Sequence, residues 1–143
     1  MTRRRGRHRA AALAAALALC ASLLIGCGDG PDSDDGVTTI TAADLPCASL
    51  DAATGVWSSA PWPPESSAPT CGWLRFDGTT PLRIEHPLGY APATVLLYIA
   101  FTEDGTQGTL ASGDPGLIES VSDTDVVVRN RTHQRFWLRL ALR

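Results

Sequence analysis

The sequence predicts an all-β fold, a small antiparallel β-sandwich of about six to seven strands that follows a signal helix and a flexible tether. Three observations lead to this prediction. Short apolar or alternating segments recur at intervals of about 8–12 residues, with turn residues between them. Residues 57–70 (WSSAPWPPESSAPT) are too rich in proline for a continuous helix or an inner strand. The chain after the tether has roughly 105 residues, which is enough for one core.

The first two alternating segments predict a pair of strands. Trp73–Asp77 places Leu74 and Phe76 on one face, and Pro81–His86 repeats the pattern. Asp77–Thr80 (DGTT) between them predicts a hairpin loop. Upstream, residues 41–50 predict a short helical turn that is broken by a proline.

The C-terminal half predicts four more strands. Ala93–Phe101 (ATVLLYIAF) is almost wholly apolar, so we expect a central strand that is covered on both faces. Leu117–Val121, Val126–Arg129 and Gln134–Leu142 follow, and Val126–Val128 is the expected hairpin partner of the last strand. That strand alternates most clearly, with Phe136, Leu138, Leu140 and Leu142 on one face and Arg135, Trp137, Arg139 and Arg143 on the other. This register predicts that loss of the Arg139 side chain is nearly neutral.

The N-terminus has the form of a secretory signal peptide. Five arginines precede Ala10–Ile25, a run of sixteen residues that are almost all apolar. The run is shorter than the roughly 20 residues that a membrane span needs, although an uncleaved anchor is the alternative. We therefore expect residues 1–26 to be a signal peptide, residues 27–36 a linker and residues 37–143 the β-sandwich domain.

The apolar run ends at Leu24-Ile25-Gly26-Cys27, which resembles the lipobox of bacterial lipoproteins. The resemblance implies that Cys27 receives a diacylglyceryl group, and that the chain is cut before Cys27, which becomes the acylated N-terminus. Acyl chains bury methylene groups at about 0.8 kcal/mol each, which is enough for stable anchoring to a membrane. A second cysteine, Cys20, follows the bulky Leu19 inside the apolar run and is a poor match. The expected location is the non-cytoplasmic side of a membrane in the cell envelope.

An acidic segment, Gly28–Gly36 (GDGPDSDDG), follows the cysteine and predicts a hydrated tether. The segment lacks the alternating oxygen ligands and the flanking helix of an EF-hand, so calcium binding is the weaker reading. The residues from 27 onward hold all 15 acidic residues and seven of the 12 arginines, so their net charge is near −8. This charge argues against nucleic acid as a partner.

Two further cysteines, Cys47 and Cys71, remain outside the signal peptide. In an oxidising compartment a pair of cysteines predicts a disulfide bond. It would close a loop of about 25 residues and stabilise the domain by roughly 3 kcal/mol. Neither cysteine has the Cys-x-x-Cys spacing that is typical of a zinc site.

Catalytic motifs are scarce in the domain, so the sequence indicates a protein that is not an enzyme and needs no cofactor. His86 precedes a proline at a strand end, where we expect it to cap a turn, and His133 lies in a polar turn, Asn130–His133. A zinc site from these two histidines and a carboxylate is conceivable, but their spacing does not require one. A carboxylate pair of Glu85 with Glu103 or Asp104 is also open, although surface carboxylates are usually solvated.

Two segments carry a further resemblance. Residues 84–92 (IEHPLGYAP) resemble a strand-turn-strand pattern of small β-sandwiches in phage tail proteins. Residues 126–142 (VVVRNRTHQRFWLRLAL) are similar in rhythm to the closing hairpin of H-type lectins. Both resemblances imply a sandwich, and neither assigns a ligand-binding residue.

The domain has four tryptophans, Trp57, Trp62, Trp73 and Trp137. Exposed aromatic rings suit sugar faces or protein partners, so Trp57, Trp62 and Trp137 are candidate ligand-binding residues. The alternative is a second apolar layer with the proline-rich segment folded over it. Two functions therefore remain: a structural or interaction module of the envelope, or a lectin-like module that binds carbohydrate. Exposed tryptophans favour the second.

Overall fold

A computed structural model describes residues 36–63, 71–78 and 80–143. The expected signal peptide, Cys27 and residues 28–35 of the linker lie outside the described residues. Gly36–Arg143 forms one compact unit with its own core. Within the described part of the chain, no helix has the length and apolarity needed to cross a membrane.

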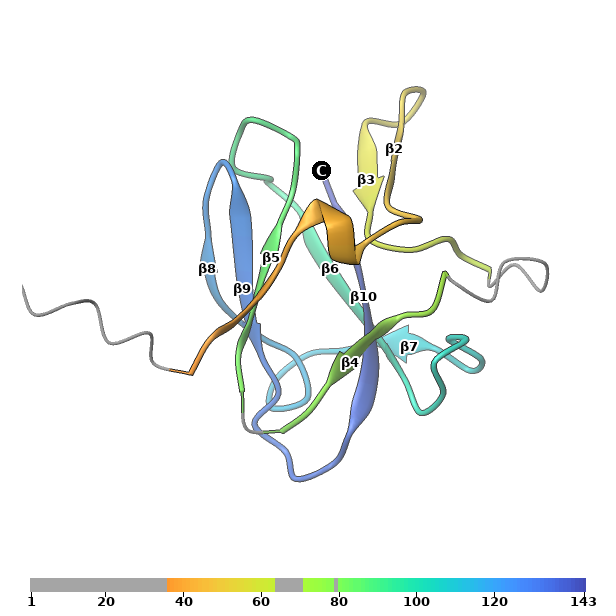
Figure 1. The fold of residues 1–143 in the computed structure, drawn as a ribbon, viewed down its shortest axis with the longest axis vertical. Helices are drawn as coiled ribbons and strands as arrows, with labels where there is room; N and C mark the ends of the chain where they lie inside the picture. The colour runs from red at the N-terminus through yellow and green to blue at the C-terminus, as the bar shows by residue number, and fades with distance from the viewer. Residues whose placement is uncertain (1–35, 64–70, 79) are drawn as a thin grey trace, which may run out of the picture. The chain divides into compact units, whose positions relative to one another are not determined.

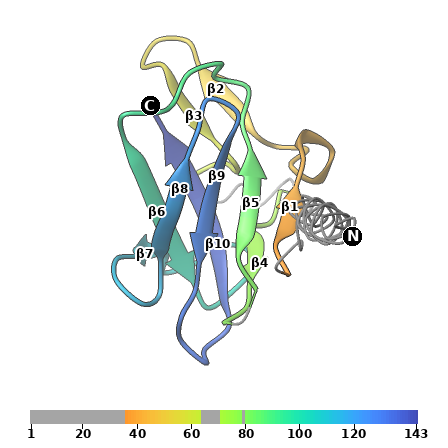
Figure 2. The same cartoon turned by 90° about the vertical axis from the view of Figure 1, so that its left-hand side faces the viewer.

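The compact unit is a sandwich of two β-sheets, as the sequence predicts (Figures 1 and 2). The smaller sheet has the strand order β1 (Thr38–Ile40), β5 (Leu82–Glu85), β9 (Asp125–Arg129) and β8 (Leu117–Val121). The larger sheet has the order β2 (Ser49–Asp51), β3 (Val56–Ser58), β10 (Phe136–Leu142), β6 (Val95–Ala100) and β7 (Thr109–Leu110), and β4 (Leu74–Phe76) also pairs with β10. All of the pairs are antiparallel except β1 with β5.

All six predicted strands are present as β4, β5, β6, β8, β9 and β10. The structure adds four strands of two or three residues each, namely β1, β2, β3 and β7. The predicted helical turn is also present, as a 3-10 helix over Ala42–Asp44. Its first turn is closed by the Asp44 carboxylate, which accepts hydrogen bonds from the Thr41 amide at 2.9 Å and the Thr41 hydroxyl at 2.8 Å.

Strand β10 organises the larger sheet. It pairs with β6 over six residues on one edge, while β4 and β3 share its other edge at opposite ends. Ser59 extends this edge beyond β3, because its amide donates to the Leu140 carbonyl and its hydroxyl accepts from the Leu140 amide. The C-terminal strand is therefore an inner strand of the sheet.

Both predicted hairpins are wrong. β4 and β5 belong to different sheets, so Asp77–Thr80 connects the two layers. β9 also lies in the smaller sheet, so Val126–Val128 faces β10 across the core instead of pairing with it. Glycine-containing turns occur both in hairpins and in connections between two sheets, so the turn sequence alone does not distinguish the two.

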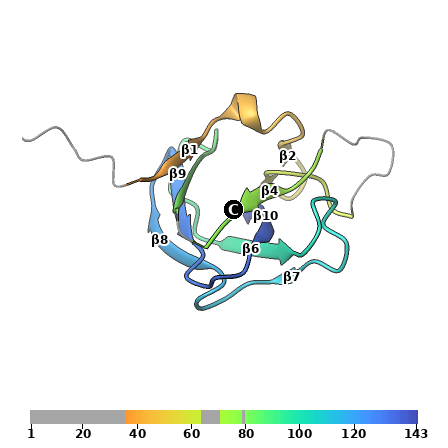
Figure 3. The same cartoon turned by 60° about the horizontal axis from the view of Figure 1, so that its bottom comes forward.

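The strands of the two sheets face each other (Figure 3), and the buried core residues come from both sheets. The predicted alternation is confirmed for the inward-facing side chains. The fully buried set includes Phe76, Ile84, Val126, Val128, Leu138, Leu140 and Leu142. Burying a side chain of this size stabilises the fold by about 1.5–3 kcal/mol.

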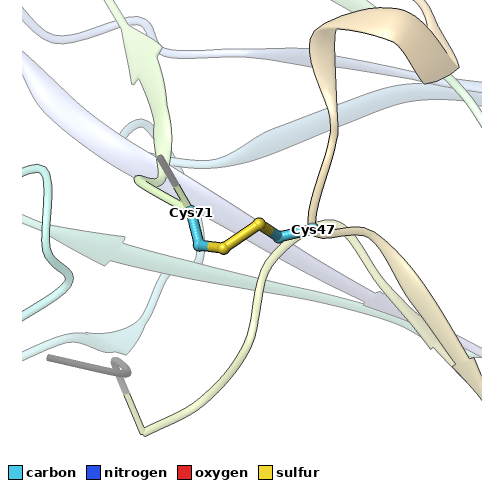
Figure 4. The surroundings of a disulfide bond; sticks show 2 residues. All are labelled: Cys47 and Cys71. Carbon is cyan, nitrogen blue, oxygen red and sulfur yellow. A yellow bond between two sulfur atoms is a disulfide. The ribbon is translucent and has the colours of Figure 1, made fainter. Parts of the chain in front are cut away.

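Cys47 and Cys71 form a disulfide bond with a Cα–Cα distance of 5.4 Å (Figure 4). The bond joins the segment after the 3-10 helix to the segment just before β4. β2, β3 and Trp62 lie in the chain between the two cysteines. The bond therefore closes the loop that carries this edge of the larger sheet.

Candidate functional site

Aromatic side chains gather on the outer face of the larger sheet. In the antiparallel register, Tyr98 of β6 lies opposite Arg139 of β10, and Trp137 lies opposite Ala100. Directly opposed residues project to the same side, so these side chains share the face that points away from the core. We call Trp62, Trp73, Tyr98, Trp137 and Arg139 the aromatic face.

Trp73 is the buried floor of this face. It packs with Ala60 and Ala100, and the partly buried Tyr98 and Trp137 pack against this cluster. The loop after β6 lies directly on the indole: a Cβ at Gly105, where φ is +72°, would come within 2.4 Å of the ring. Only glycine allows both this backbone conformation and this close approach. The loop is also held by the Trp73 amide, which donates to the Glu103 carbonyl at 2.8 Å.

Trp62 is the exposed member of the face, with 45% of its surface accessible. Its ring stacks on Tyr98 at 6.2 Å between centroids and 18° between planes, and it contacts Trp73 at 5.4 Å and 45°. Aromatic pairs at such distances contribute about 0.5–1.5 kcal/mol each beyond burial of area. The indole is therefore held in place before any partner binds.

Arg139 lies beside the stacked rings and is half-buried. Its Nε donates to the Ala60 carbonyl at 2.8 Å, and a terminal nitrogen donates to the Ser58 hydroxyl at 3.0 Å. The guanidinium carbon lies 5.3 Å from the centroid of the Tyr98 ring. Burial lowers the pKa of Arg139, but a guanidinium keeps its charge at neutral pH. Alternation correctly gives the direction of this side chain but not its partners, and these hydrogen bonds favour a larger cost for its loss than the near-neutral one that the register predicts.

Two leucines extend the face beyond the aromatic rings. Leu110 of β7 lies opposite Tyr98, and Leu96 of β6 lies opposite Ala141 of β10. Both leucines are exposed, Leu110 to 58%. The prediction that Ala93–Phe101 is covered on both faces is thus correct only in part, because β6 has a covered outer face near Tyr98 and Ala100 but an open one at Leu96.

The three candidate tryptophans fall in different places. Trp62 is exposed on the aromatic face, and Trp137 is partly buried in it. Trp57 lies in β3 opposite the core residue Leu142, and only 3% of its surface is accessible. The expectation that residues 57–70 do not form an inner strand is wrong at Trp57 and Ser58, because β3 pairs with β2 on one side and with β10 on the other. Tyr98 and Arg139 were not among the predicted binding residues. Period-2 alternation places Arg139 on the same face as Trp137, whereas Tyr98 joins them only through the pairing of β6 with β10.

Two polar residues differ from expectation because they are buried. Only 6% of His86 is exposed, and neither ring nitrogen has a hydrogen-bond partner among the described residues, so the expected turn cap is not seen there. Asn130, expected in an exposed turn, is fully buried. Its side chain bonds Phe76, Thr132 and Gln134 and so joins the turn before β10 to the end of β4.

The aromatic face is suited to binding by contact. It offers the flat ring of Trp62, two exposed leucines at its margin and one fixed guanidinium.

Within the described residues, no group of three or more histidine, cysteine or carboxylate side chains is placed to hold a metal ion. Neither a protein-family model, nor a curated protein, nor a solved structure matches this chain.

Proposed function

We propose that this chain is a lipid-anchored protein of the cell envelope whose domain is an interaction module. The observation that carries the proposal is Leu24-Ile25-Gly26-Cys27 at the end of a basic and then apolar segment. The acidic residues after Cys27 would hold the domain away from an anionic lipid surface. The Cys47–Cys71 disulfide supports the proposal, because such bonds persist in oxidising compartments outside the cytoplasm.

Labelling with fatty acid in a bacterial host tests the anchor. We expect the wild-type chain to incorporate labelled palmitate and Cys27→Ser to lose the label and its membrane attachment. Cys20→Ser is the matched control, because it removes a thiol from the same segment and should leave labelling unchanged. Labelling that persists in Cys27→Ser, or that disappears in Cys20→Ser, would contradict the assignment.

A second candidate function is carbohydrate binding at the aromatic face. It is favoured by Trp62, whose ring is exposed and already fixed by stacking on Tyr98 and Trp73. The C–H face of a sugar ring packs on such a flat indole, and a rigid aromatic side chain loses little entropy on binding. Arg139 lies beside Tyr98 and adds a cation at the margin of the ring.

Titration with soluble oligosaccharides, including chitotetraose and muropeptides, tests this candidate by tryptophan fluorescence. We expect a saturable change in the wild-type protein and none in Trp62→Ala. Phe101→Ala is the matched control, since Phe101 is 71% exposed but packs on Phe136 away from the aromatic face. Equal responses from wild type and Trp62→Ala would refute a sugar site at this ring.

A further inference from the structure

A half-open cavity of about 390 Å³ lies between the 3-10 helix, Trp57 and the end of β5, and its described lining includes no residue of the aromatic face. Its described lining has five apolar residues, among them Leu45, Ala48 and Trp57, and two polar ones, Glu85 and His86. Cavities of about 300–1,000 Å³ with mostly apolar walls and a few polar groups are typical of small-molecule sites. The cavity therefore has the size and lining of a small-molecule site, with His86 as one of its two polar residues.

His86 is the polar group of this wall that has no partner within the described protein. The ring is more than nine-tenths buried, and neither Nδ1 nor Nε2 makes a hydrogen bond. Its backbone is fixed, because its amide donates to the Thr124 carbonyl at 2.8 Å. A buried donor and acceptor without partners is rare in folded proteins and needs an explanation at each occurrence. Neither nitrogen is open to the cavity in this conformation, so a bound molecule would supply the missing partner after a small rotation of the imidazole ring.

The lining also restricts the chemistry of that molecule. The apolar walls require a mostly apolar body, and the indole of Trp57, whose centroid is 6.5 Å from that of His86, favours an aromatic ring. A neutral imidazole has one donor and one acceptor, and a hydroxyl group can satisfy either. Glu85 and the acidic net charge of the domain disfavour an anion. We propose that this cavity is a binding site for a small uncharged aromatic alcohol of the phenol type, with its hydroxyl hydrogen-bonded to His86.

Three probes of one shape separate the parts of the proposal. 4-Ethylphenol carries the hydroxyl, ethylbenzene lacks it, and 4-ethylbenzoate replaces it with a negative charge. The full chain is labelled with ring-¹³C histidine and placed in phospholipid nanodiscs, and empty discs correct for partition into lipid. The chain has three histidines, so the His86 signal is assigned by its loss in His86→Phe or, independently of that variant, by elimination with His8→Phe and His133→Phe.

We expect 4-ethylphenol to shift the His86 signal saturably and to bind at least about tenfold more tightly than ethylbenzene, while 4-ethylbenzoate binds weakest. His86→Phe keeps the volume but removes both nitrogens, so it should abolish the preference for the phenol. Ala48→Phe fills the cavity and should abolish binding of all three probes. His133→Phe and Ala53→Phe are the matched controls, because both residues are exposed and neither lines the cavity.

The wild-type comparison decides the proposal even if His86→Phe does not fold. Equal affinities for 4-ethylphenol and ethylbenzene, or no saturable shift of the His86 signal at millimolar concentration, would overturn it. So would binding that survives in a folded Ala48→Phe. None of these results depends on the lipid anchor or on the aromatic face, so failure here leaves the proposed function standing.

Discussion

Removal of the Asn130 side chain tests how the two sheets are joined. The fully buried amide nitrogen donates to the Phe76 carbonyl at 3.2 Å and the Gln134 carbonyl at 2.8 Å. The amide oxygen accepts from the Thr132 amide at 2.9 Å and its hydroxyl at 2.7 Å. Asn130→Ala breaks all four bonds and leaves the buried Phe76 carbonyl without this donor.

The size of the effect follows from the environment of each bond. A buried group left without a partner costs about 1–3 kcal/mol, and each of the three less buried bonds contributes about 0.5–1 kcal/mol. These contributions add to about 2.5–6 kcal/mol, and we expect Asn130→Ala to lower the free energy of unfolding by a value near the middle of this range, about 3–5 kcal/mol, which is a large part of the 5–15 kcal/mol that is usual for a small domain. With a urea m-value of about 1.5 kcal/mol/M, the unfolding midpoint falls by roughly 2–3 M.

Urea unfolding followed by tryptophan fluorescence measures this change. Asn130→Asp should be similarly damaging, because it keeps the oxygen facing Thr132 but turns a second oxygen toward two carbonyls. Gln134→Ala is the control from the same turn, since its side chain is exposed and, among the described residues, bonds just the neighbouring Arg135 carbonyl. An Asn130→Ala protein within about 1 kcal/mol of the wild type would show that the turn is not held by this side chain.

Two further predictions use the same assay. Leu140→Ala should lower the free energy of unfolding by about 2–5 kcal/mol, because the side chain is fully buried. Arg139→Ala should lower it by about 1–2 kcal/mol, because it removes two hydrogen bonds and the contact with Tyr98. Equal losses of stability in the two variants would refute the register of β10. The pKa of Asp77 is lowered, chiefly by its hydrogen bond with Arg135, so its contribution is present above the carboxyl's ordinary pKa and lost as pH falls through the lowered value. The urea midpoint of the wild type should therefore drop below about pH 4, and that of Asp77→Asn should drop less; parallel curves would contradict the coupling.

The sequence predicts the facing of side chains better than the pairing of strands. Alternation with a period of two assigns a face whatever the neighbouring strand is, and it correctly buries Phe76, Ile84 and Leu140. Pairing depends on contacts between distant segments, which is why Asp77–Thr80 could be interpreted as a hairpin. Strands as short as β7, with two residues, have no periodicity to detect.

Burial of polar residues is the second limit of the sequence. Histidine and asparagine are usually exposed in turns, and only the packing of β4 against the turn before β10 makes Asn130 an internal linker. His86 is buried by the same kind of long-range packing, since the lining of its cavity comes from the 3-10 helix, β3 and the end of β5. Local sequence patterns therefore placed both His86 and Asn130 in turns and did not predict that either side chain is buried.

The tryptophans show why a count of aromatic residues overstates the number of binding residues. Trp57 and Trp73 are each only 3% exposed. Trp57 packs in the core between the two sheets, and Trp73 packs in the buried cluster on the outer face of the larger sheet. Their loss would disturb folding and could not be interpreted as loss of a ligand contact. Trp62 differs because its ring is held by Tyr98 and Trp73 on one side while much of its surface stays accessible. A change in binding that leaves stability nearly intact can thus be sought at Trp62, and this is why the test of carbohydrate binding rests on that residue.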